Sequence, residues 1–421
     1  MLAVVQGWYR RIRSDHLLAG SSYLAANTFA VTGLGVLFWW SAARLYPPES
    51  IGLAVVAIST VQLITTAAQM GLGYGVIRFL PEAGAEAAML LNSALTVTGG
   101  LALCLAALVV FVGPHLSPEL GRLSQSGGYG VMFILMTVSL ALFQLLDQML
   151  AALRASRILL WKNMLTGLGR VGLLALASVR PSPTMVMLAF ALPLVLAVAV
   201  TTLLVLPRQI AGYAPRPAFH VARLRQVSGY SANSYAGNLL HDLPYQALPH
   251  LIANQLGAAS AAYFYIAWNI FSMLTTVSAS VSLSLFVEGS REAGRLAQLR
   301  TRALGVALGI TAAMALAVIV AADLLLGIFG PAYASGGAPA LRWLALATLP
   351  AALVYLLTAT QRIRKQLGSI NTAFGLIALV SLLLAQLSLQ RGLFMVGIVW
   401  GVAQSAAAAY LLLIRKRQTG S

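Results

Sequence analysis

Charge is scarce in this chain, and cysteine is nearly absent. Only 9% of its 421 residues are charged, Asp and Glu number 10 together, and Cys104 is the single cysteine. One cysteine excludes an internal disulfide, and the histidines are too dispersed to give metal-ligand spacing. The glycine-rich stretch 71–75 has no Lys-Ser/Thr pair and no preceding strand, so a phosphate loop is unsupported. The sequence therefore predicts a protein that is not an enzyme and carries neither metal nor cofactor.

Long apolar segments fill most of the chain instead, and 59% of its residues are hydrophobic. About 20 apolar residues cross the hydrocarbon of a bilayer as one helix, which also satisfies its own backbone groups. Twelve such segments are expected, at 20–44, 51–77, 87–112, 129–153, 163–179, 184–206, 228–254, 260–287, 303–328, 339–360, 368–388 and 392–413. The chain is thus predicted to be an all-α integral membrane protein with twelve transmembrane helices.

Basic residues occupy every second gap between these segments. Besides Arg78, the groups lie at 10–13, 154–162, 208–225, 291–302, 362–365 and 415–417. Because Lys and Arg are retained on the cytoplasmic side, this rhythm predicts that both termini are cytoplasmic. The net charge of +17 then indicates contact with anionic lipid headgroups rather than with nucleic acid. The charged N-terminus lacks the pattern of a cleavable signal peptide.

The longest cytoplasmic gap divides the chain into two similar halves. We expect an N-terminal lobe at 1–206, a cytoplasmic linker at 207–227 and a C-terminal lobe at 228–421. Ser22–Asn27 and Gly229–Asn233 open the two halves with related residues at an offset near 207. Two six-helix lobes of parallel orientation around a central cavity are a common transporter plan, which permits alternating access.

The ends of several segments carry a recognisable pattern. Ala43–Leu53, Gly71–Gly73 and Ile77–Glu82 resemble the opening of the O-antigen and polysaccharide flippases, and Leu256–Ala267 with Ser284–Ser290 resembles the matching part of the second lobe. These flippases belong to the multidrug/oligosaccharidyl-lipid/polysaccharide exporter superfamily. The resemblance implies a MATE-like fold in the bacterial inner membrane. It also implies flipping of an undecaprenyl-diphosphate-linked oligosaccharide for surface or exopolysaccharide synthesis, beside polysaccharide polymerases or glycosyltransferases.

Other functions predict other features. A MATE-type drug/cation antiporter of the same superfamily should have a cavity rich in carboxylates. A polymerase or glycosyltransferase of the same pathway should have large extramembrane loops, whereas the outward loops here are short, with at most 16 residues at 113–128. A membrane scaffold would not need charged residues within its spans. The flippase fits the sequence better than these three.

Ionisable residues within the spans are the first candidates for function, because each costs about 2.5–3.5 kcal/mol to insert. Asp147 and Arg170 lie at similar depth on consecutive antiparallel segments. They could form a structural ion pair, Arg170 could anchor the diphosphate, or Arg170 could reach toward the headgroups. These interpretations stay open. Asp323 and Arg342, near the outward face, are expected to pair.

Cations that hold phosphate oxygens are the second requirement of a flippase, and Arg meets it through bidentate hydrogen bonds. The candidate substrate-binding residues are Arg44, Arg78, Arg170, Asn27 and Asn233. The two asparagines suit sugar hydroxyls, although helix packing explains each equally well.

The seventh segment combines an acid with two prolines. Asp242 follows His241 and precedes Pro244 and Pro249, and interrupted helices near the midplane often mark a transporter's site. Asp242 could therefore couple transport to a proton or cation, and Asp147 is the second candidate for this role. The alternative for Asp242 is a carboxyl group satisfied by its neighbours.

Overall fold

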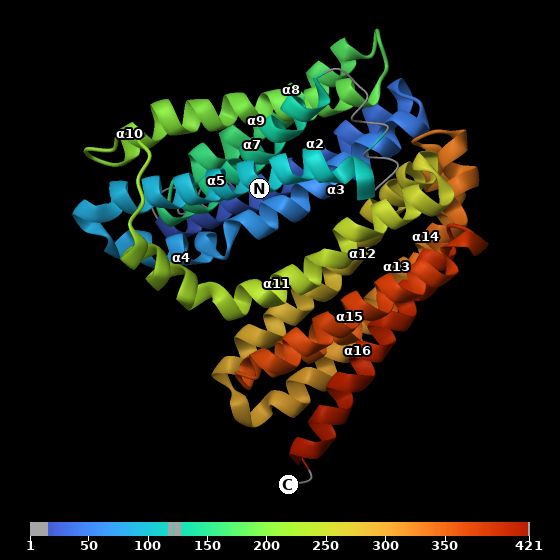
Figure 1. The fold of residues 1–421 in the computed structure, drawn as a ribbon. Helices are drawn as coiled ribbons and strands as arrows, with labels where there is room; N and C mark the ends of the chain where they lie inside the picture. Colours follow the sequence, from blue (N-terminus) through green and yellow to red (C-terminus); the bar gives the residue numbers. More distant parts are fainter. Residues whose placement is uncertain (1–15, 117–120, 122–127, 420–421) are drawn as a thin grey trace, which may run out of the picture. The chain divides into compact units, whose positions relative to one another are not determined.

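The computed structural model describes residues 16–116, 121 and 128–419, and every regular element among them is a helix (Figure 1). The first half forms α2 (His16–Leu45), α3 (Pro48–Gln69), α4 (Leu72–Phe79), α5 (Ala87–Leu116), α7 (Tyr129–Ala152), α8 (Ser156–Ala177), α9 (Pro183–Val200) and α10 (Leu206–Gln209). The second half forms α11 (Val221–Leu256), α12 (Ala258–Arg291), α13 (Leu296–Gly327), α14 (Pro331–Ile363), α15 (Leu367–Ser388) and α16 (Met395–Thr419). The predicted all-α class is confirmed.

Each of the twelve predicted segments overlaps a helix of this series. Within the described residues, 10 helices are long and apolar enough to cross a membrane. The two helices that fall short are α8 and α11, whose sequences are more polar. The total of twelve spans therefore stays a prediction.

The predicted segment 51–77 is wrong at its end, because the helix breaks there. Met70 and Gly71 adopt φ angles of 46° and 73°, and a separate helix, α4, starts at Leu72. A residue in the left-handed region ends a helix, and glycine at this position avoids the steric cost of a Cβ atom. Arg78 therefore belongs to α4 and not to α3.

The described helices pack as two compact units. One holds α2, α4, α5, α7, α8, α9 and α10, with the end of α3 from Ile64 onward. The other holds α12 to α16, with Tyr46–Leu63 and the part of α11 from Asn233 onward. The lobe boundaries at 206 and 228 remain predictions from the sequence.

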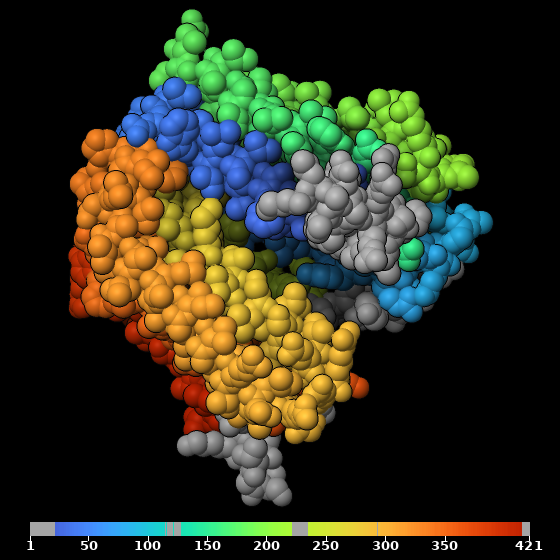
Figure 2. All heavy atoms as spheres, turned by 180° about the vertical axis from the view of Figure 1, so that it is seen from behind, coloured from blue at the N-terminus to red at the C-terminus, as the bar shows by residue number. Residues whose placement is uncertain are grey.

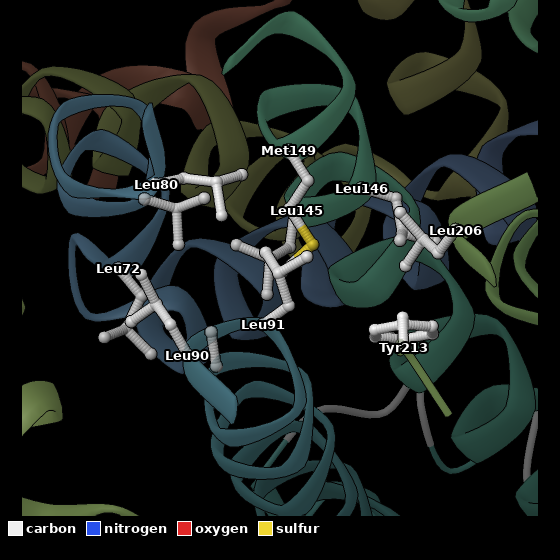
Figure 3. Close-up of a cluster of buried hydrophobic side chains, with 11 residues drawn as sticks. Leu72, Leu80, Leu90, Leu91, Leu145, Leu146, Met149, Leu206 and Tyr213 are labelled. Atoms are coloured by element: carbon white, nitrogen blue, oxygen red, sulfur yellow. The ribbon is translucent and has the colours of Figure 1, made fainter. Parts of the chain in front are cut away.

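The core of the first unit gathers leucines from α4, α5 and α7 (Figure 3). Tyr213, from the segment between α10 and α11, is buried in the same cluster. Asn92 of α5 donates a hydrogen bond to the carbonyl of Ala214 at 2.9 Å, and Thr96 accepts one from the amide of Ala218 at 3.1 Å. The predicted linker is therefore packed against α5 over these residues.

The second unit is built around α14, which contacts α12, α13, α15 and α16. Figure 2 shows α12 and α13 side by side on one face of this unit. Small residues allow close helix approach, as is usual in membranes: a Cβ atom on Gly397 of α16 would lie 2.6 Å from the amide nitrogen of Leu344 in α14. The expected pair of Asp323 and Arg342 joins α13 to α14 and is confirmed.

Gly52 in α3 permits the closest backbone approach of the second unit. A Cβ atom at this position would lie 1.7 Å from the carbonyl oxygen of Ala258, at the start of α12. We expect Gly52→Ala to lower the free energy of unfolding by about 1–3 kcal/mol, since the backbone must shift to make room. Unfolding by SDS titration in mixed micelles measures the change. Gly33→Ala in α2 is the control, because no atom lies within 4 Å of its added methyl group; equal stability of both variants would contradict the prediction.

Candidate functional site

The first unit contains a polar cavity of about 390 Å³. Helices α2, α7, α8 and α9 line it, and the polar or charged side chains in its wall are Asn27, Thr28, Thr32, Asp147, Asn163, Thr166 and Arg170. Apolar rings from Phe38, Trp39, Phe143 and Phe190 complete the wall. Three sequence candidates, Asn27, Asp147 and Arg170, are thus brought together in one place.

Helix α8 supplies three of these seven polar or charged side chains through its periodicity, and α2 supplies another three. The helix begins at Ser156, directly after a turn in which Arg154 has a φ angle of 56°. Asn163, Thr166 and Arg170 then follow at spacings of three and four residues, which place them on one face. The same face approaches α2 closely, because a Cβ atom on Gly167 would lie 2.7 Å from Cδ1 of Leu34.

Asp147 is held by Lys162, a residue that the sequence prediction had assigned to a cytoplasmic basic group. The Lys162 Nζ atom lies 2.6 Å from Oδ1 of Asp147, and the two side chains are 5% and 29% exposed. The same ammonium lies 3.1 Å from the ring centroid of Phe143, a cation–π contact. Because α8 starts at Ser156 rather than at 163, Lys162 lies well inside the helix.

Asn163 connects this ion pair to α2. Its Nδ2 atom donates to Oδ1 of Asn27 at 3.0 Å and lies 3.5 Å from Oδ2 of Asp147. The Asn27 amide therefore has a structural contact, as its alternative interpretation required, and it also faces the cavity. A chain of polar contacts runs from α2 through α8 to α7.

Lys162 is the charged partner that the structure gives Asp147, and the pairing of this acid with Arg170 stays a prediction. The acid already has Lys162 and Asn163 as partners, and both lie one to two turns closer than Arg170 to the start of α8. The Arg170 guanidinium lies 3.8 Å from the ring centroid of Phe190 in α9. The wall of the cavity therefore holds one guanidinium and one carboxylate, and the carboxylate is neutralised by a buried lysine.

The remaining candidates lie elsewhere. Arg44 is exposed in the last turn of α2, and Arg78 is exposed in α4, where it pairs with Glu82. Neither lines the 390 Å³ cavity. The backbone of Asn233 belongs to α11, but its side chain lies outside the described residues.

Asp242 lies in the second unit, on α11. Its Oδ1 atom lies 3.0 Å from Nδ1 of His241, and its side chain is 46% exposed. His241 lines a smaller cavity of about 230 Å³ together with Asn238, Tyr355, Arg362 and Phe374. The interpretation of Asp242 as a carboxyl group satisfied by its neighbour agrees with this contact, and a coupling role remains a prediction.

An aromatic cluster beside this cavity is absent from the sequence-based candidates. Trp268 lies 5.0 Å from Tyr245 and 4.9 Å from Trp400, measured between ring centroids, so rings from α11, α12 and α16 meet. His241 continues the cluster, 5.1 Å from Tyr245. Spacing of four residues between His241 and Tyr245 was the available signal, since it puts both rings on one helix face.

Substitution of Asp242 tests its coupling role. We expect Asp242→Asn to abolish the pH dependence of transport, because the amide occupies the same space without titrating. The measurement is the initial transport rate in proteoliposomes over a series of external pH values, with Asp323→Asn as the control for a general loss of charge. A variant that keeps the pH profile of the wild type would remove Asp242 from coupling.

No candidate metal centre accompanies these cavities. Within the ranges that the structure describes, no three His, Cys, Asp or Glu side chains are grouped so as to hold a metal ion.

Comparison with known proteins identifies a family that matches the sequence and solved structures with a similar fold. A family model described as "Polysaccharide biosynthesis protein" matches residues 17–286. No curated protein sequence matches the chain. An inward-facing multidrug resistance MATE family transporter of the MOP superfamily aligns with a TM-score of 0.70 at 15% identity, over 95% of this chain and 98% of that one.

Two further solved structures extend the comparison. The lipid II flippase MurJ, in an inward closed conformation, aligns with a TM-score of 0.74 at 13% identity, over 94% of this chain and 87% of that one. A MOP superfamily transporter from Pyrococcus furiosus aligns with a TM-score of 0.59 at 14% identity, over 96% of both chains. At these identities the likeness establishes the transporter fold alone.

Proposed function

The chain belongs to the polysaccharide biosynthesis protein family, and from this membership we propose that it flips a diphosphate-linked oligosaccharide lipid across the bacterial inner membrane. The substrate would be carried on undecaprenyl diphosphate and destined for surface or exopolysaccharide. Transport would proceed by alternating access. The family description, the transporter fold and the MurJ neighbour support this proposal together.

The observation that carries the proposal is the charge of the 390 Å³ cavity. Arg170 and Asp147 are the charged side chains in its described wall, and Lys162 offsets the charge of Asp147. The Arg170 guanidinium adds a positive charge to this wall, and its planar set of donors matches phosphate oxygens. Asn27, Asn163 and the hydroxyl groups of Thr28 and Thr32 offer uncharged hydrogen bonds to sugar.

The second candidate is a drug/cation antiporter, which the MATE neighbours favour. A cation would need a carboxylate that is free to face it. The one carboxylate in the described wall of the cavity is engaged by Lys162 at 2.6 Å. This charge arrangement favours an anionic substrate over a cationic one.

Reconstitution into liposomes tests the proposal. The purified chain should accelerate the movement of an undecaprenyl-diphosphate-linked oligosaccharide between leaflets, measured by enzymatic modification of the sugar that has reached the outer face. Accumulation of a cationic dye against an imposed proton or sodium gradient, without movement of the lipid, would instead establish the antiporter.

The cellular setting follows from the same proposal. The basic gaps support an orientation with both termini in the cytoplasm, where the lipid-linked sugar is assembled. Polysaccharide polymerases or glycosyltransferases of the pathway would then act beside the transporter. Arg44 and Arg78 remain proposed substrate contacts outside the described cavity, and Asn233 remains a proposed contact whose side chain lies outside the described residues.

A further inference from the structure

A third hollow, which is apolar, lies between α8 and α9. It has a volume of about 590 Å³ and runs between α8 and α9, lined by Ile158, Trp161, Lys162, Leu165, Thr166, Gly169, Leu173, Leu192, Pro193, Leu196, Ala197, Val200, Thr201 and Val205. We call it the α8/α9 groove. Its wall is almost entirely hydrocarbon, unlike the polar cavity.

The groove follows from how the two helices meet. They are in contact at Gly169, where an added Cβ atom would lie 3.4 Å from Cβ and Cγ of Pro193. Pro193 lies inside α9 and removes one backbone donor from the helix, which favours a bend. Further along, Thr201–Val205 forms a π-helical turn, and such turns often occur at functional sites.

The groove and the polar cavity meet at α8. Thr166 lines both of them. Lys162 lines the groove, while its Nζ atom reaches Asp147 in the wall of the cavity. If the charged group of an amphiphile lies beside Arg170, the α8/α9 groove is therefore available to its apolar part on the same helix, α8.

We propose that the α8/α9 groove holds the polyprenyl chain of the substrate while its diphosphate lies in the polar cavity. This assignment rests on the proposed flippase function. From Ile158 to Leu173 the groove follows α8 for about 22 Å at 1.5 Å per residue, a large part of a hydrocarbon core about 30 Å thick. A long isoprenoid can fill that length, and a short one cannot.

Packing, rather than removal from water, must give the groove its selectivity. The polyprenyl chain leaves lipid that is as apolar as the groove, so the favourable free energy of its binding comes from van der Waals contacts. The effect of filling the groove should accordingly be moderate and should depend on the length of the bound chain.

The experiment compares undecaprenyl diphosphate with farnesyl diphosphate on the full chain in lipid nanodiscs. Ala197→Trp places a large ring in the groove, and Leu192→Trp is a second groove-filling variant. Ala199→Trp is the matched control, because it makes the same change on α9 at a residue outside the groove. Affinities are measured by native mass spectrometry, and folding by size-exclusion chromatography.

We expect each groove-filling variant to weaken binding of undecaprenyl diphosphate by about tenfold, or about 1.4 kcal/mol, and to leave farnesyl diphosphate unchanged. Ala199→Trp should bind both like the wild type. If the ratio of the two affinities is the same in all four proteins, the groove holds only bulk lipid and the assignment is wrong. If the wild type binds neither diphosphate, the proposed function fails first and the assignment with it.

Discussion

Lys162→Met should lower the free energy of unfolding by about 3 kcal/mol. The change removes the partner of Asp147, whose side chain is only 29% exposed, and leaves an uncompensated carboxylate in a largely apolar bundle. Breaking a buried ion pair from one side typically costs about 3–5 kcal/mol, because the remaining charge stays desolvated. The lower end of this range of energies applies to Asp147, since the cavity gives its carboxylate partial access to water.

A double-substitution cycle separates the loss of the pair from the loss of either residue. Lys162→Met with Asp147→Asn should recover most of the stability, because neither charge of the pair remains. SDS titration in mixed micelles gives the free energy of unfolding for each variant. The exposed pair Arg342–Asp323, with side chains 41% and 62% exposed, is the matched control, and Arg342→Gln should cost less than about 1 kcal/mol. A Lys162→Met protein as stable as the wild type would show that the pair contributes nothing to folding.

The double variant also distinguishes structure from transport. If the ion pair only supports the bundle, Lys162→Met/Asp147→Asn should flip lipid at the rate of the wild type. Loss of transport in a stable double variant would instead assign Asp147 the coupling role that the sequence proposed for it.

Much of the fold could be predicted because lipid leaves the chain few choices. Each predicted segment overlaps a helix, since a backbone in hydrocarbon must satisfy its own hydrogen bonds. The break at Met70 and Gly71 could not be predicted, because apolar residues continue on both sides of it. The start of α8 was also misjudged: its first turns carry Arg157 and Lys162, which resemble a cytoplasmic loop by composition.

The candidate site was predicted in its parts but not in its contacts. Asp147 and Arg170 were predicted to lie at a similar depth in the membrane, and both line the polar cavity. Depth does not specify rotation about a helix axis, so the partner of Asp147 had to come from the structure. The cluster around Trp268 and Trp400 was missed for a similar reason, because its rings come from helices far apart in sequence.

The second large effect concerns transport, and it falls on Arg170. We expect Arg170→Gln to slow flipping of the lipid-linked oligosaccharide by about 10- to 100-fold while the protein still inserts and folds. Hydrogen bonds to a charged group are worth about 1.5–3 kcal/mol, and glutamine keeps a donor without the positive charge. Arg170→Lys should flip lipid at a rate between those of the wild type and Arg170→Gln, since an ammonium keeps the charge but loses the planar pair of donors.

The measurement is the leaflet-exchange rate in proteoliposomes, with folding checked by the same SDS titration. Arg180→Gln is the control, because Arg180 is an exposed arginine beyond the end of α8 and outside the cavity. The contact between Arg170 and the Phe190 ring, at 3.8 Å, predicts a small loss of stability in Arg170→Gln, which the titration separates from the loss of transport. If Arg170→Gln flips lipid as fast as Arg180→Gln, the guanidinium does not hold the diphosphate. Arg44 and Arg78, outside this cavity, would then be the remaining proposed contacts for the anionic group of the substrate.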